Sequence, residues 1–135
     1  MPIAPRSAPL EFGIALIDDQ HKELFEALNW LADSIEDGAE NQQLDELMAC
    51  IAQRTIKHCQ TEESLMKDLG YPGRSRHSDQ HTELIRHIRS VQYLRVKGQP
   101  VTPDIFEFLS EWFVQHIQEY DREYVVYMKD LTPAP

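Results

Sequence analysis

The chain has 135 residues, the usual size of one domain and enough to bury a single core. Its apolar fraction of 41% and charged fraction of 27% are ordinary for a globular protein and exclude the collagen-like and disordered classes. The formal net charge of -10 disfavours binding to nucleic acid or to an anionic membrane surface.

Residues 1–16 are predicted to form a short N-terminal arm. Residues 1–12 contain three prolines and no apolar run long enough for a signal peptide, and no later stretch can span a bilayer, so we expect a cytoplasmic protein. Cys50 and Cys59 are expected to be free thiols. Nine residues of one helix place them about 13 Å apart on nearly opposite faces, which agrees with a reducing compartment.

Turn-forming residues divide residues 17–131 into four long segments. The boundaries are Gly38, the stretch 70–73, the stretch 98–103 and Pro133. Each segment carries apolar residues at the three-then-four spacing of an amphipathic helix. Four helices with short connections predict an all-α, antiparallel up-down-up-down four-helix bundle that makes residues 1–135 one domain.

The inward stripes of the four helices follow from this spacing. In chain order they are His21, Leu24, Leu28, Leu31 and Ile35; Leu44, Leu47, Ile51, Thr55, His58, Glu62, Leu65 and Leu69; His77, His81, Leu84, Ile88 and Val91; and Ile105, Leu109, Trp112, His116 and Tyr120. Ser7 or Asp18 is expected to start structure near the first helix. Thr102 before Pro103 has the N-cap and first-turn chemistry expected of the fourth.

Polar side chains that can bind metal occupy stripe positions where the pattern demands apolar residues. They are His21, His58, Glu62, His77, His81 and His116. A single histidine in such a place is more often a hydrogen-bonded core residue than a ligand. Five imidazoles and a carboxylate buried without partners would each cost several kcal/mol, more than a domain of this size can absorb. A bound metal removes that conflict.

The spacing within two helices supports a metal site. His58 and Glu62 are four residues apart, as are His77 and His81, so each pair projects from one helix face toward one metal or two neighbouring metals. His87 lies about 80° away from the direction of the second pair and is expected on the surface.

Asp121 leaves two interpretations open. It follows His116 by five residues, about 140° around a regular helix, so both reach one site only if the helix widens locally or the metal pair is broad. The alternative is an exposed carboxylate in a run with Glu119 and Glu123.

These motifs resemble the hemerythrin family, specifically its single-domain bacterial members, from Phe12 to about Met128. The matching pieces are Ile17-Asp18-Asp19-Gln20-His21 followed by Leu24; His58-x-x-x-Glu62-Glu63; His77-x-x-x-His81; and Trp112-x-x-x-His116-Ile117-x-x-x-Asp121. The resemblance implies two oxo- or hydroxo-bridged iron ions. One would be held by His77, His81 and His116, the other by His21 and His58, with Glu62 and Asp121 bridging both. The five-residue offset of Asp121 belongs to the family pattern.

The function implied by the resemblance is reversible binding of molecular oxygen rather than enzymatic turnover. With these ligands and a bridging hydroxide, one coordination position stays open, on the iron with two histidines. Leu24, Trp112, Ile117 and Cys59 are expected to line the oxygen pocket. Cys59 departs from the phenylalanine that the family commonly has there, and Phe12 stands where a tryptophan is often found.

Several other functions are compatible with the same ligands. They are an oxygen or redox sensing module, iron storage, nitric oxide binding, and a di-iron peroxidase or oxidase. Oxygen-activating bundles typically carry paired Glu-x-x-His motifs, and this sequence has none. Zinc also suits imidazole, but its usual four-coordinate sites do not need seven ligands. We expect a monomer, and delivery to an unidentified recipient protein is compatible with the sequence.

Overall fold

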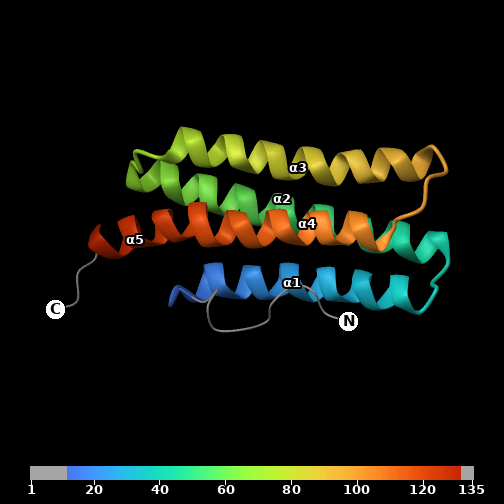
Figure 1. Cartoon of the computed structure of the whole chain (residues 1–135). Helices are drawn as coiled ribbons and strands as arrows, with labels where there is room; N and C mark the ends of the chain where they lie inside the picture. Colours follow the sequence, from blue (N-terminus) through green and yellow to red (C-terminus); the bar gives the residue numbers. More distant parts are fainter. Residues whose placement is uncertain (1–11, 132–135) are drawn as a thin grey trace.

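The computed structural model describes residues 12–131, and every regular element in that range is helical. Three long helices come first, α1 (Ala15–Glu36), α2 (Asn41–Leu69) and α3 (Arg74–Val96). A fourth rod joins α4 (Pro103–His116), the π-helical turn η2 (Ile117–Asp121) and α5 (Arg122–Leu131) end to end. Each rod runs antiparallel to the one before it (Figure 1). The expected up-down-up-down four-helix bundle is confirmed.

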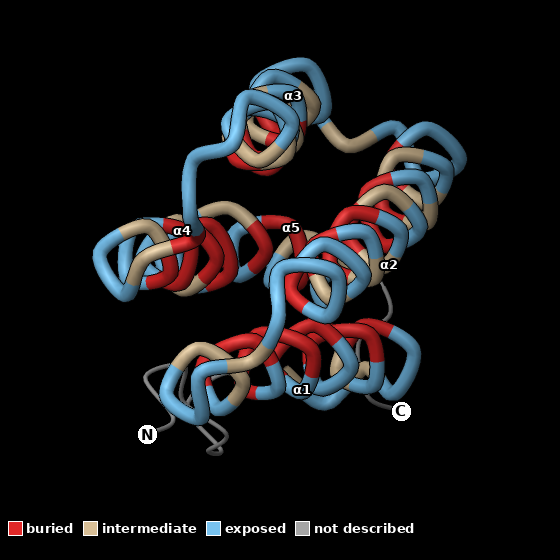
Figure 2. Tube along the Cα trace, turned by 90° about the vertical axis from the view of Figure 1, so that its right-hand side faces the viewer, coloured by how far each residue is buried: buried red, intermediate tan, exposed pale blue. Residues whose placement is uncertain are grey.

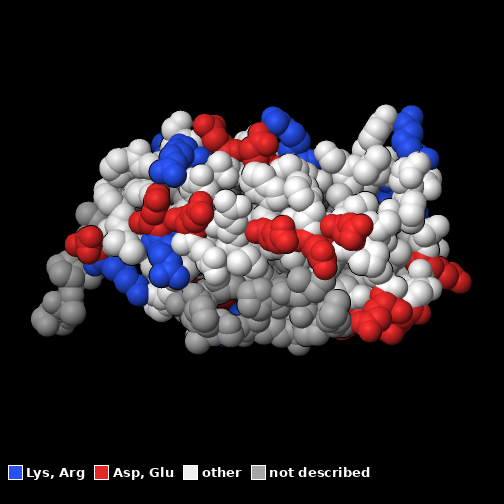
Figure 3. Space-filling model, in the orientation of Figure 1, with Lys and Arg blue, Asp and Glu red and all other residues white. Residues whose placement is uncertain are grey.

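The rods surround a common interior. α1 and α3 each pack against α2 and α4, and the buried residues of all four rods face inward (Figure 2). Within residues 12–131, no helix is both long enough and apolar enough to cross a membrane. On the face seen in Figure 3, acidic side chains lie across the middle, at both ends and along the upper edge, and basic side chains lie among them toward the ends and the upper edge.

The ends of the helices have local causes. α1 begins at Ala15, two residues before the expected start of the bundle, and the carboxylate of Asp18 in its first turn accepts the N–H groups of Phe12 (2.8 Å) and Gly13 (3.0 Å). Asp18 therefore organises this end as expected, whereas Ser7 lies outside the described residues. Thr102 caps α4 by accepting the Ile105 N–H at 3.3 Å, which confirms the predicted N-cap.

α2 ends at its cap residue Gly70, whose backbone conformation favours glycine. Gly70 has φ of 63° and ψ of 36°, the left-handed conformation that other residues rarely adopt. Its N–H bonds Lys67 O at 3.2 Å, and the next N–H, of Tyr71, bonds Met66 O at 3.0 Å. The sharp stop turns the chain back so that α3 lies antiparallel to α2.

Apolar residues fill the interior on both sides of a polar layer. The larger cluster includes Leu24, Leu28, Ile51, Leu84, Ile88, Leu109, Phe113 and Ile117. The smaller one consists of Ile17, Met66, Tyr124 and Val125, from α1, α2 and α5. On these three rods, predicted ligands lie between the two clusters. On α3, the predicted ligands come before the apolar residues of the larger cluster.

The expected stripes were wrong by one position in four places. On α2, Met48 and Met66 are buried, whereas the expected Leu47 and Leu65 are only partly so, and Leu69 is 36% exposed. On α4, Phe106 and Phe113 are buried, whereas the expected Ile105 and Trp112 are only partly so. The apolar face of a packed helix is more than 100° wide, so a single three-then-four row does not identify which edge of that face is deepest.

Candidate metal centre

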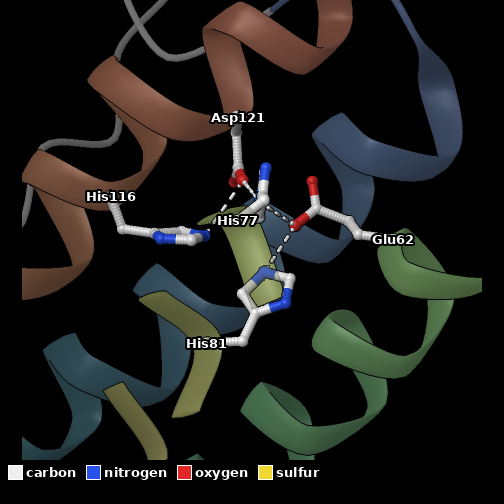
Figure 4. A group of neighbouring side chains, drawn as sticks. All are labelled: Glu62, His77, His81, His116 and Asp121. Atoms are coloured by element: carbon white, nitrogen blue, oxygen red, sulfur yellow. Dashed lines mark hydrogen bonds and ion pairs between the residues drawn. The ribbon is translucent and has the colours of Figure 1, made fainter. Parts of the chain in front are cut away.

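The seven predicted ligands form one buried layer across the bundle. They are His21, His58, Glu62, His77, His81, His116 and Asp121, and none is more than 3% exposed. All four rods contribute, because the stripes of α1, α2 and α3 meet the π turn at the same height. Figure 4 shows five of them, with their rings and carboxylates directed toward one another.

Possible ligand atoms gather in two groups, each with all atoms within 4.8 Å of one another. The three-imidazole group contains His77, His81 and His116, and the two-imidazole group contains His21 and His58. Both groups also contain Glu62 and Asp121, so these two carboxylates lie between them.

Asp121 directs one oxygen toward each group. Its Oδ1 lies 2.8 Å from His77 Nε2 and 3.0 Å from His116 Nε2. Its Oδ2 lies 2.8 Å from His21 Nε2 and 3.4 Å from His58 Nε2. A carboxylate in this orientation can bridge two metal ions.

Glu62 lies between the groups through a single oxygen. Its Oε1 is 3.0 Å from both His58 Nε2 and His81 Nε2, and 3.3 Å from His77 Nε2. Its Oε2 is buried and has no hydrogen-bond partner among the described residues. The second oxygen is thus available to a ligand that the protein itself does not supply.

The π turn explains how Asp121 reaches the layer. In η2 the backbone hydrogen bonds span five residues rather than four, so the helix is locally wider than an α-helix. His116 precedes this turn, Asp121 ends it, and their side-chain atoms meet at 3.0 Å. Of the two interpretations that the sequence left open, local widening is the correct one.

The arrangement fits a bound cation better than an internal hydrogen-bond network. The Nε2 atoms of His77 and His116 lie near Asp121 Oδ1, yet none of the three atoms has a hydrogen-bond partner in the described chain. At such distances the N–H directions must miss the oxygen. Unsatisfied buried polar atoms cost about 1–3 kcal/mol each, and imidazole nitrogen with carboxylate oxygen is a donor set that transition metals accept.

Electrostatics in the layer hold protons on His58 and His77 when metal is absent. Burial alone lowers the pKa of His58, but the Glu62 and Asp121 carboxylates outweigh it and raise that pKa to about 10. The same competition raises the pKa of His77 to about 9. Burial favours the neutral forms of both acids, yet the imidazoles hold the pKa of Glu62 and of Asp121 below the usual range. Metal ions therefore compete with protons for these ligands.

Two of the five imidazoles are also held at their outer nitrogens. Gln20 Oε1 accepts from His58 Nδ1 at 2.9 Å, and Glu63 Oε2 accepts from His81 Nδ1 at 3.2 Å. Gln20 and Glu63 are part of the sequence motifs, but the motifs alone assign them no role. Their positions directly beside the ligands His21 and Glu62 could have indicated one.

The expected oxygen-pocket residues do not share one environment. Leu24, Cys59 and Ile117 are at most 2% exposed and lie next to ligand positions along their helices. Trp112 is half-buried, with its ring centroid 4.4 Å from that of His87. Burial raises the pKa of the Cys59 thiol, which keeps it protonated.

His87 differs from its expected surface position. It is half-buried, and its ring also contacts Phe108 with centroids 4.9 Å apart. Trp112 and Phe108 extend far enough from α4 to cover it, a contact that helical angle alone does not reveal. Both cysteines are free, as expected.

Comparison with known proteins gives a consistent result. The family model described as the hemerythrin HHE cation binding domain matches residues 13–127. A bacteriohemerythrin of Pseudomonas aeruginosa is 33% identical over 86% of this chain and 75% of that protein. One from Methylococcus capsulatus is 31% identical over 84% of this chain and 88% of that protein.

A solved structure gives the same result in three dimensions. Wild-type hemerythrin superposes with a TM-score of 0.81 at 27% identity, covering 89% of this chain and 94% of that one. Together with the cluster of histidine, glutamate and aspartate, these likenesses support a non-haem iron protein. The chain belongs to the hemerythrin family.

Proposed function

We propose that the protein binds molecular oxygen reversibly at a non-haem di-iron centre and does not act as an enzyme. The observation that carries the proposal is the unequal pair of ligand groups that share Glu62 and Asp121. The three-imidazole group would hold one iron and the two-imidazole group the other. An oxo or hydroxo bridge would complete the pair.

The unequal groups give the two irons different coordination. His77, His81 and His116 would give one iron three imidazoles, and His21 and His58 would give the other only two, with Glu62 and Asp121 shared. Oxygen would bind beside His21 and His58, where fewer protein ligands are available, and iron would supply the electrons for that binding. The protein's part is to keep this position accessible to oxygen but not to bulk water.

Residues that neighbour ligands of both groups suit a small apolar ligand. Leu24 lies one turn after His21 on α1, and Cys59 directly follows His58 on α2. Ile117 follows His116, and Trp112 precedes it by one turn. We propose these four residues as the oxygen pocket, where apolar side chains exclude water and slow irreversible oxidation.

The first test is a metal count. Protein loaded with iron under anaerobic conditions should contain close to two irons per chain. A preparation that retains one metal per chain, or that takes zinc in preference to iron, would contradict the di-iron proposal.

The second test follows oxygen directly. The iron-loaded protein is reduced anaerobically, exposed to oxygen and then degassed while its visible spectrum is recorded. Reversible binding predicts a band that appears with oxygen and disappears without it. A single irreversible change would instead favour redox sensing or iron storage, and sustained consumption of peroxide or substrate would indicate an enzyme.

A further inference from the structure

The partners of the two outer nitrogens differ in charge. Gln20, a neutral amide, holds His58 of the two-imidazole group. Glu63, a carboxylate, holds His81 of the three-imidazole group. The Nδ1 atoms of His21, His77 and His116 have no hydrogen-bond partner in the described part of the chain. Each metal position therefore has one oriented imidazole, with unlike partners.

The hydrogen-bond network fixes the tautomer of His58. The Thr61 hydroxyl donates to Lys57 O at 2.9 Å, so it is free to accept from Gln20 Nε2 at 3.1 Å. Gln20 must then present its carbonyl oxygen to His58, and His58 Nδ1 must carry the proton. When a metal displaces the other proton of the ring, the lone pair of Nε2 faces the site.

A second network fixes His81 in the same way. Ser78 Oγ donates to Glu63 Oε1 at 2.5 Å, and a carboxylate can only accept, so His81 Nδ1 donates to Oε2. Glu63 is 37% exposed and borders a surface groove with Lys67, where solvent can stabilise its charge. Gln20 is only 6% exposed, so the buried partner is the uncharged one.

The charge of the partner changes the strength of the ligand. A carboxylate that accepts from Nδ1 draws the proton toward itself and leaves more electron density on Nε2. A metal bound to that Nε2 is stabilised in its higher oxidation state. A neutral amide orients the ring with less of this effect.

We propose that Gln20 and Glu63 are positioning residues that make the two metal positions unequal, giving the metal in the two-imidazole group the higher reduction potential. The inference rests on the proposed function in requiring a metal in each group. It adds that the oxygen-binding position is the one held more readily in its reduced state, which favours release of oxygen.

Isosteric charge swaps test the proposal. Gln20→Glu adds a carboxylate beside His58, and Glu63→Gln removes the one beside His81. Two variants change charge nearby without contacting a ligand imidazole: Gln60→Glu on the exposed side of α2, and Asp79→Asn in the groove beside Glu63. All four proteins, and the double swap, are compared with the unchanged chain.

The first measurement uses zinc-loaded protein and needs neither iron nor oxygen. In its NMR spectrum, the Nδ1 proton of His81 should lie downfield of that of His58. Glu63→Gln should move the His81 signal upfield and weaken zinc binding by about tenfold, and Gln20→Glu should move the His58 signal downfield. The proposal is overturned if the Nδ1 proton signals of His58 and His81 do not shift in the swap variants. It is also overturned if the two control variants shift them by the same amount.

The second measurement is a potentiometric titration of iron-loaded protein. Each single swap should reduce the separation between the two one-electron potentials, and the double swap should reverse which iron is oxidised first. The controls should shift both potentials together. An unchanged separation in Glu63→Gln, whose partly exposed side chain makes folding secure, contradicts the inference. If no two-step iron titration is found, the proposed function fails, while the zinc spectra still decide the roles of Gln20 and Glu63.

Discussion

Toward the α1–α2 turn, the bundle interior holds Leu28, Ile51, Ile88 and Leu109, each at most 1% exposed. One or two turns further along the same helical faces, it holds imidazoles and carboxylates that are buried just as completely. The apolar half is stabilised by contacts among its own side chains. The polar layer needs a cation to satisfy its lone pairs. Two regions with equal burial and the same helical spacing therefore differ in what stabilises them. The apolar half needs only its own side chains, whereas the polar layer needs a bound cation.

Removing a shared carboxylate should have the largest effect in the polar layer. Glu62→Ala and Asp121→Ala each delete oxygens that contact both groups, so iron affinity should fall by about a hundredfold or more. Iron retained after gel filtration is the measurement. His87→Ala is the control, because His87 contacts Trp112 and Phe108 and belongs to neither group. Equal iron loss in all three variants would contradict the ligand assignment.

A cavity in the apolar half should give the opposite pattern. Leu28→Ala removes a fully buried side chain and should lower the free energy of unfolding by about 2–5 kcal/mol. Iron content should stay unchanged, because Leu28 lies two turns from His21. Chemical denaturation and metal analysis of the same samples measure both quantities. Loss of iron comparable to that of Asp121→Ala would show that the two regions are not independent.

Metal removal should make the polar layer sensitive to pH. In metal-free protein the pKa values of His58 and His77 are raised to about 10 and 9, so their stabilising contribution is present below the unfolded value near 6.5 and is lost as pH rises through 9 to 10. The lowered pKa values of Glu62 and Asp121 contribute above about pH 4 and are lost on acidification.

Thermal unfolding of metal-free protein should therefore show a lower Tm at pH 10 than at pH 7. Iron-loaded protein should show a smaller difference, because metal replaces the protons on the imidazoles. A metal-free protein with equal Tm at both values would contradict the proposed proton balance.

The smallest expected effect concerns a polar residue in the apolar half. Asn29 is fully buried, and neither atom of its amide has a hydrogen-bond partner in the described chain. Asn29→Leu should raise the free energy of unfolding by about 1 kcal/mol and leave iron content unchanged. Denaturant titration measures the free energy of unfolding. Ser110→Ala is a second test of the same kind, because the buried Ser110 hydroxyl also has no hydrogen-bond partner in the described chain. A loss of stability would mean that an internal water satisfies the amide.

Much of the fold and the layer follows from the sequence because helical spacing is regular. Polar residues at stripe positions predicted the burial of His21, His58, Glu62 and the α3 pair, and turn residues predicted four rods. Asp121 required a change in backbone geometry that spacing could suggest only as one of two alternatives. Deviations from regular geometry depend on what the helix packs against, so the sequence alone could not decide between them.

Contacts between helices were less accessible to sequence reasoning. Which of Trp112 and Phe113 lies deeper depends on the rotation of α4 against its neighbours, which spacing does not specify. The outer partners Gln20 and Glu63 also depend on distances between rods. Their bonds to His58 and His81 join α1 to α2 and α2 to α3.

The widened turn η2 also absorbs one residue of chain length. It places Asp121, five residues after His116, on the face that a regular α-helix gives to the fourth following residue. Tyr124 and Val125 therefore stay in phase with His116 and reach the smaller apolar cluster. Deleting one residue from η2 would leave that phase nearly unchanged, whereas deleting one from the regular part of α4 would rotate everything beyond it by about 100°.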